Sequence, residues 1–115
     1  MSDVTMYHNP RCSKSRQTLQ LLGEKGVEPE IVEYLENPPN EEALGKLLDM
    51  LGLEPRELMR TKEDEYEELG LAEVTDRQAL IKAMVEYPVL IERPIVVKGD
   101  SARLGRPPEQ VLEIL

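Results

Sequence analysis

The sequence predicts an α/β fold in which an N-terminal βαβ unit and a C-terminal ββα unit flank a helical insertion. Three observations support this prediction. A strand, a helix and a second strand follow one another within roughly 30 residues, which is the length of a βαβ unit. Leucines recur at helical spacing in the middle of the chain, and two short apolar runs near the C-terminus are separated by a Gly-Asp turn.

The βαβ unit begins with residues 4–7 (VTMY), which alternate apolar and polar side chains as strands do, and residues 8–10 (HNP) end this strand. A helix is predicted from Ser13 onward, and Gly26 suits the position just after its last turn. The second strand is predicted over residues 30–34 (EIVEY), reached by a right-handed crossover. The apolar face of the helix comprises Thr18, Leu19, Leu21 and Leu22.

The helical insertion is predicted between the second and third strands, over about residues 38–88. Asn40 can cap its first helix, and a short helix with Pro55 in its first turn is predicted over residues 54–60. Residues 75–78 (TDRQ) are typical of a capping box that begins at Thr75. The expected buried positions are Leu44, Leu47, Leu48 and Leu51 in the first helix and Leu80, Ile81, Met84 and Val85 in the last.

The ββα unit begins after Arg93-Pro94. Residues 95–97 (IVV) and 102–104 (ARL) predict a hairpin around the Gly99-Asp100 turn, and residues 107–108 (PP) begin a final helix with an apolar side. Repeats, linkers and low-complexity tracts are absent from the sequence. We therefore expect a single domain over residues 1–115.

Composition limits the classes of partner. The net charge of −9 argues against nucleic acid, because binding to phosphates requires a basic surface. No apolar run approaches the ~20 residues of a membrane helix, and the N-terminus lacks the features of a signal peptide. The single cysteine suits a reducing compartment. We therefore expect a cytoplasmic protein with no nucleic-acid or membrane partner.

The chemistry is predicted to centre on Cys12. This residue lies between a predicted strand and a predicted helix, where free N–H groups and the helix dipole stabilise an anion. Four neighbours, His8, Arg11, Lys14 and Arg16, are expected to add to this effect and lower the pKa of the thiol. The alternative is a buried structural cysteine, but such cysteines seldom lie in a polar, cationic loop.

Three arginines outside this loop are candidates for binding an anionic substrate beside the thiolate. Arg60, Arg93 and Arg106 each follow an apolar or turn segment that could place the side chain at the rim of the core. A guanidinium forms bidentate contacts with oxyanions. For any one of the three, a surface salt bridge to a glutamate is the competing interpretation.

Six motifs in order along the chain resemble those of the glutaredoxin-coupled arsenate reductase family. They are residues 8–16 (HNPRCSKSR), 34–39 (YLENPP), 58–60 (LMR), 68–72 (ELGLA), 93–97 (RPIVV) and 105–107 (GRP). The resemblance covers essentially the whole chain and is closest to the short, reductase-like branch of the family. It implies a thioredoxin-like fold with a helical insertion, in agreement with the predicted order of elements.

The resemblance also implies roles for individual residues. Cys12 would attack arsenate, His8 and Ser15 would help to keep the thiol ionised, and Arg60, Arg93 and Arg106 would bind the oxyanion. Asn9 and Pro94 would be structural residues of the site, with Pro94 preceded by a cis peptide bond. Glutathione would be the co-substrate and glutaredoxin the protein partner, with no bound cofactor.

Two alternatives share Cys12. The first is a glutathione-dependent thiol-disulfide reductase, although a disulfide substrate does not need three arginines. The second is a transcriptional regulator with a C-x-x-C redox switch, but residues 12–15 read C-x-x-S. One cysteine and one histidine provide no ligand cluster, so no metal site is predicted.

Overall fold

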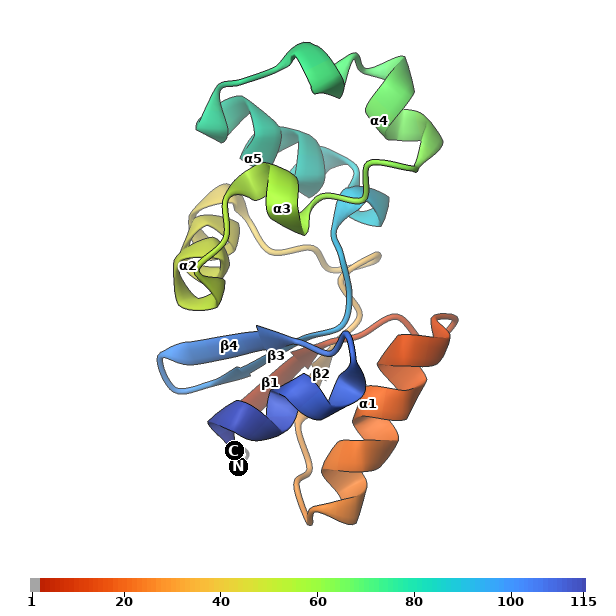
Figure 1. Cartoon of the computed structure of the whole chain (residues 1–115), viewed down its shortest axis with the longest axis vertical. Helices are drawn as coiled ribbons and strands as arrows, with labels where there is room; N and C mark the ends of the chain where they lie inside the picture. The colour runs from red at the N-terminus through yellow and green to blue at the C-terminus, as the bar shows by residue number, and fades with distance from the viewer. Residues whose placement is uncertain (1–2) are drawn as a thin grey trace. The chain divides into compact units, whose positions relative to one another are not determined.

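The computed structural model describes residues 3–115, which form two compact units (Figure 1). One unit comprises residues 3–37 and 93–115, and the other comprises residues 38–92. The second unit is thus the predicted insertion, extended at its C-terminal end from residue 88 to residue 92. The assignment of the whole chain to one domain stays a prediction.

The first unit is built on a four-stranded sheet in the order β2-β1-β3-β4. The strands are β1 (Val4–Tyr7), β2 (Glu30–Val32), β3 (Ile95–Lys98) and β4 (Ser101–Leu104). β1 and β2 are parallel, whereas β3 pairs antiparallel with both β1 and β4. This is the predicted βαβ–ββα arrangement and the thioredoxin-like fold class. The second strand is shorter than predicted because Tyr34 already lies beyond its end.

Two helices of the first unit pack on each other and on the sheet. They are α1 (Ser13–Glu24) and the 3-10 helix η3 (Pro108–Ile114), and Figure 1 shows both on the same side of the strands. The final element was predicted as a helix, and the structure forms it with the tighter 3-10 geometry. A buried cluster of this unit is aliphatic: Val4, Met6, Leu22, Val96 and Val111. Such burial of apolar side chains is the main stabilising contribution.

Both ends of α1 lie where the sequence predicts them. Cys12 is the N-cap residue, with extended backbone angles, and the helix begins at Ser13. Gly26 has a φ of 75°, a left-handed conformation that glycine adopts without steric cost, and its N–H donates to the carbonyl of Gly23 at 3.0 Å. The helix therefore carries the thiol at its N-terminus, as predicted.

The hairpin of β3 and β4 brings two Arg-Pro segments together. In its register Ile95 pairs with Leu104, and the pairing continues as the Gly105 N–H donates to the Pro94 carbonyl at 3.0 Å. The Arg93–Pro94 peptide bond is cis, as the resemblance implies, and so is Arg106–Pro107. Gly105 lies against α1: a Cβ at this position would be 2.4 Å from Thr18 Oγ1 and 2.7 Å from Pro94 Cγ.

The second unit is helical. Its elements are α2 (Glu41–Leu51), α3 (Pro55–Leu58), α4 (Asp64–Glu68), η1 (Leu71–Glu73), α5 (Arg77–Glu86) and η2 (Pro88–Leu90). A single antiparallel bridge, Met59 to Ile91, joins the segment after α3 to the segment after η2. The core includes the predicted positions Leu44, Leu47, Leu48, Leu80, Ile81 and Met84.

The caps of the second unit confirm one prediction and correct another. Asn40 caps α2, since its side chain accepts from the Ala43 N–H at 2.8 Å. The helix α5 is capped by Asp76, which accepts from the Ala79 N–H at 3.0 Å, so the capping box beginning at Thr75 was wrong by one residue. A carboxylate is the stronger acceptor, which explains why the aspartate takes the cap.

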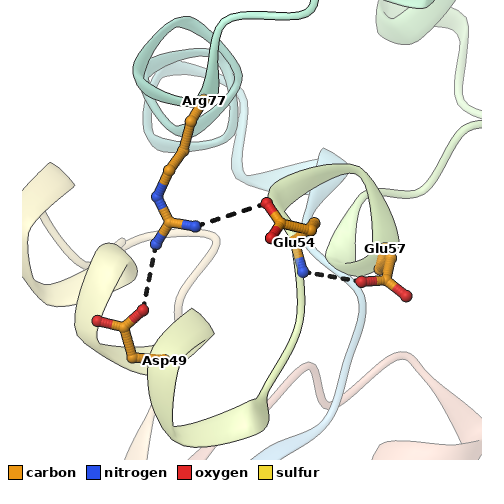
Figure 2. A network of polar contacts seen from close by, with 4 residues as sticks. All are labelled: Asp49, Glu54, Glu57 and Arg77. Carbon is orange, nitrogen blue, oxygen red and sulfur yellow. Dashed lines mark hydrogen bonds and ion pairs between the residues drawn. The ribbon is translucent and has the colours of Figure 1, made fainter.

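Two arginines connect the helices of the second unit in different environments. Arg56 is partly buried, and its guanidinium donates to the carbonyls of Leu71 and Val74 and to the Tyr66 hydroxyl. Figure 2 shows the other, Arg77, between Asp49 and Glu54, with nitrogen–oxygen distances of 3.3 and 3.7 Å. The Arg77 contacts are exposed to solvent, whereas those of Arg56 satisfy backbone carbonyls.

Within residues 3–115, no helix combines the length and the apolar character that crossing a membrane would require.

We expect Gly105→Ala to destabilise the protein by about 1–3 kcal/mol, because the added methyl group would overlap Thr18 and Pro94. Urea unfolding measures this change. Gly45→Ala is the matched control: it lies inside α2 with no atom near the new Cβ, and it should stabilise the protein by about 1 kcal/mol. Equal effects of the two substitutions would contradict the close approach at Gly105.

We expect Arg56→Met to lower the free energy of unfolding by about 2 kcal/mol, because it removes charge-assisted hydrogen bonds from two carbonyls and a hydroxyl. Arg77→Met should cost less than about 1 kcal/mol, because its ion pairs are exposed. Chemical denaturation of both variants gives the comparison. A larger loss for Arg77 would show that the exposed network stabilises the unit more than the buried one.

Candidate functional site

The loop before α1 is a tight turn that presents Cys12. The Cys12 N–H donates to the Asn9 carbonyl at 3.0 Å, and the Asn9 side-chain oxygen accepts from the Arg11 N–H at 3.0 Å. Arg16 reaches back from α1 and donates to the Pro10 carbonyl at 2.9 Å. The thiol itself is partly exposed. Asn9 thus organises the turn that leads into the helix.

A buried network of hydrogen bonds between His8, Asn9 and Ser15 supports this turn. His8 Nδ1 lies 2.6 Å from Ser15 Oγ, and the same hydroxyl accepts from the Asn9 N–H at 3.0 Å. All three residues are buried. Because the Asn9 N–H uses a lone pair of the hydroxyl, the Ser15 proton is available to Nδ1 of a neutral imidazole. The network therefore locks His8, Asn9 and the first turn of α1 together.

The pKa of Cys12 lies below its ordinary value. Burial raises it, but this effect is outweighed by hydrogen bonds from the Ser15 and Lys14 backbone N–H groups and by the charge and a side-chain hydrogen bond of Arg93. The N–H groups are the free donors of the helix N-terminus. The thiolate is thus stabilised as the sequence predicts.

The loop cations expected to lower this pKa are not the groups that do so. The side chains of Arg11, Lys14 and Arg16 are absent from the stabilising interactions of Cys12, and the guanidinium that contributes is that of Arg93. All three side chains are exposed to solvent, and the Arg16 guanidinium is hydrogen-bonded to the Pro10 carbonyl. Lys14 acts through its backbone alone.

His8 does not supply a positive charge to the thiolate. Burial lowers the pKa of His8, the charge of Arg16 lowers it further, and the opposing charge of Glu33 does not compensate. The imidazole is therefore neutral near pH 7. Its contact with the loop is the hydrogen bond to Ser15.

Two of the three candidate arginines meet in the first unit. Arg93 is hydrogen-bonded to Cys12, and Arg106 Nη1 donates to the Arg93 carbonyl at 3.1 Å. The hairpin register explains this juxtaposition, since Arg93 and Arg106 each stand one residue beyond the Pro94–Gly105 pair. The Arg93 guanidinium thus lies at the thiolate, and that of Arg106 contacts the Arg93 main chain. Guanidiniums are suited to hold an oxyanion.

Arg60 belongs to the second unit. There its Nη2 forms an ion pair with Glu63 Oε1 at 3.1 Å, and its N–H donates to the Leu90 carbonyl at 2.7 Å. The salt bridge that was the competing interpretation is thus present for Arg60. Its role in binding an oxyanion stays a prediction.

Two contributors to the site were not identified from the sequence. Gly105 allows the β4 end to approach Thr18 on α1, and Glu33 acts on His8 through its charge. The sequence feature that could have identified Gly105 is its position directly before Arg106-Pro107. Glu33 is one of many glutamates, and only the pairing of β1 with β2 brings it near His8.

No group of three or more His, Cys, Asp or Glu residues that could hold a metal ion occurs in the described part of the chain. The donors at the site are N–H groups and guanidiniums, which bind anions.

Comparisons with known proteins agree on one family. The sequence model of the ArsC family matches residues 7–114. An uncharacterized protein of Escherichia coli K12, YfgD, is 61% identical over 114 residues, which cover 97% of this chain and 96% of that protein. The arsenate reductase of Haemophilus influenzae is 50% identical over 114 residues, covering 97% and 98%.

A solved structure of an arsenate reductase from Vibrio cholerae is 55% identical, covers 97% of both chains and superposes with a TM-score of 0.94. The likeness thus extends to the arrangement of the elements as well as to the sequence. On the family match and on these relatives, the chain belongs to the ArsC family.

Proposed function

We propose that the protein reduces arsenate to arsenite through the Cys12 thiolate, using glutathione and glutaredoxin. The observation that carries the proposal is the stabilised thiolate at the N-terminus of α1, hydrogen-bonded to Arg93. The family and the arsenate reductases among its relatives support the same reaction. A thiolate is the reactive form of cysteine, and a neighbouring cation reduces its repulsion of an anionic substrate.

The first step forms a bond between the Cys12 sulfur and arsenic. One As–O bond breaks, and its oxygen leaves as water after protonation. Arg93 and Arg106 hold the remaining oxygens, and the family resemblance adds Arg60 as a third ligand. Holding the oxyanion beside the sulfur contributes more to the rate than the lowered pKa does, because nucleophilicity falls with basicity.

Two external thiols complete the reaction, because the chain contains a single cysteine. Glutathione displaces a second oxygen of the arsenic as water, so that arsenic carries both the Cys12 and the glutathione sulfur. A glutaredoxin thiolate then attacks the glutathione sulfur to form a mixed disulfide, and the As–S bond to glutathione breaks with its electron pair left on arsenic. Water finally displaces the Cys12 sulfur from the reduced arsenic and releases arsenite. Arsenic gains two electrons and the two thiol sulfurs lose them. Overall, arsenate and two thiols yield arsenite, one disulfide and water, with Cys12 regenerated. This chemistry suits a cytoplasmic protein, since both thiols belong to a reducing compartment.

We expect arsenate-dependent NADPH oxidation in the presence of glutathione, glutaredoxin and glutathione reductase, and Cys12→Ser should abolish it. Arg106→Ala should raise the KM for arsenate about 10-fold or more, since it removes a charge-assisted contact to the oxyanion. Arg77→Ala, an exposed arginine of the second unit, is the control and should leave turnover unchanged.

A folded protein without arsenate turnover would contradict the proposal. If such a protein still exchanged disulfides with glutathione through Cys12, the thiol-disulfide reductase would be the better assignment.

We expect Arg93→Ala to raise the pKa of Cys12, because the thiolate loses a neighbouring cation and a hydrogen bond. At a fixed pH near 7 less thiolate is then present, so alkylation by iodoacetamide slows and its pH profile moves to higher pH. Arg93→Lys should fall between the wild-type and alanine proteins. Arg11→Ala is the control, and an equal shift in that variant would contradict the assignment to Arg93.

A further inference from the structure

A cavity of about 420 Å³ lies beside the Cys12 loop in the first unit. The buried residues His8 and Asn9 form its floor, and the exposed residues Arg11, Glu33, Leu35 and Glu36 form its rim. Its volume falls in the lower part of the range of ~300–1,000 Å³ found for small-molecule sites.

The cavity is placed next to the thiol by strand pairing. The parallel strands β1 and β2 end at the same edge of the sheet, and the His8 N–H donates to the Val32 carbonyl at 2.9 Å just beyond them. This pairing sets the loop of Arg11 against the turn of residues 33–36. Asn9, in the cavity floor, accepts from the Cys12 N–H at 3.0 Å. A ligand in the cavity therefore lies against the loop that carries Cys12.

The rim carries both signs of charge on side chains that are available to a ligand. Within residues 3–115, neither Arg11 nor Glu33 nor Glu36 takes part in a side-chain ion pair. Leu35 adds an apolar contact to the rim and is 43% exposed. A zwitterionic peptide has the complementary groups: carboxylates, an ammonium group and short methylene segments.

We propose that this cavity binds the peptide-thiol co-substrate, glutathione, with Arg11 holding a carboxylate and Glu33 and Glu36 holding the ammonium group. The proposal rests on the proposed function, which requires a peptide thiol next to Cys12. The rim explains how the protein distinguishes such a peptide from a small neutral thiol, because 2-mercaptoethanol has no group for Arg11 or for the two glutamates.

The direct test uses S-methylglutathione, which has the charges of glutathione but no reactive thiol. We expect saturable binding to the full-length protein by calorimetry, with NMR shifts at Asn9, Arg11 and residues 33–36. Arg11→Ala and the double variant Glu33→Gln/Glu36→Gln should each raise the Kd about 5-fold or more. The matched control is Glu24→Gln/Glu28→Gln, which removes the same charge outside the cavity and should leave the Kd unchanged.

The kinetic test compares thiols in the arsenate assay. Arg11→Ala should raise the KM for glutathione about 5-fold without changing the KM for arsenate or the rate with 2-mercaptoethanol. Absence of saturable S-methylglutathione binding, or equal weakening in the control double variant, would overturn the cavity assignment. Binding at the cavity without arsenate turnover would refute the proposed function alone, whereas turnover with an unchanged KM for glutathione in the cavity variants would refute the cavity alone.

Discussion

The stabilised thiolate of Cys12 depends on the free N–H groups at the start of α1. Cys12 is the N-cap residue of this helix, so the backbone donors of Lys14 and Ser15 that no carbonyl satisfies are directed at its sulfur. These donors are part of the backbone and stay in place as long as the helix is formed. The reactivity of the thiol is therefore coupled to the packing of α1 on the sheet, where Leu22 joins the buried core.

The register of the β3–β4 hairpin brings Arg93 and Arg106 together. Because the pairing of β3 and β4 continues through Pro94 and Gly105, the arginines that flank this pair come together at one end of the sheet. The same contact needs a residue without a side chain, since Thr18 of α1 occupies the space where a Cβ would lie. One glycine thus allows α1, which carries the thiol, to approach the segment that carries Arg93 and Arg106.

Because His8 is neutral, it supports the Cys12 loop through a hydrogen bond and not through a positive charge. A buried imidazole bonded to Ser15 holds the loop in place and contributes no full charge to the thiolate. His8 directly follows β1 and also forms part of the floor of the cavity that Glu33 and Arg11 line. The loop of residues 8–12 thus contacts two groups of charged residues: Arg93 of the hairpin segment, which acts on Cys12, and the cavity rim of Arg11, Glu33 and Glu36.

The sequence by itself determined the order of the elements, the position of Cys12 at a helix N-terminus and the hairpin around the Gly99-Asp100 turn, because these follow from local periodicity, caps and turns. It did not determine which cation stabilises the thiolate. Arg11, Lys14 and Arg16 are close to Cys12 in sequence, but Arg93 is the cation that acts on the sulfur, because the pairing of β1 with β3 brings this distant residue to the loop. The neutral state of His8 and the cavity between two parallel strand ends were likewise decided by tertiary structure, since burial and non-local contacts do not appear in a local pattern.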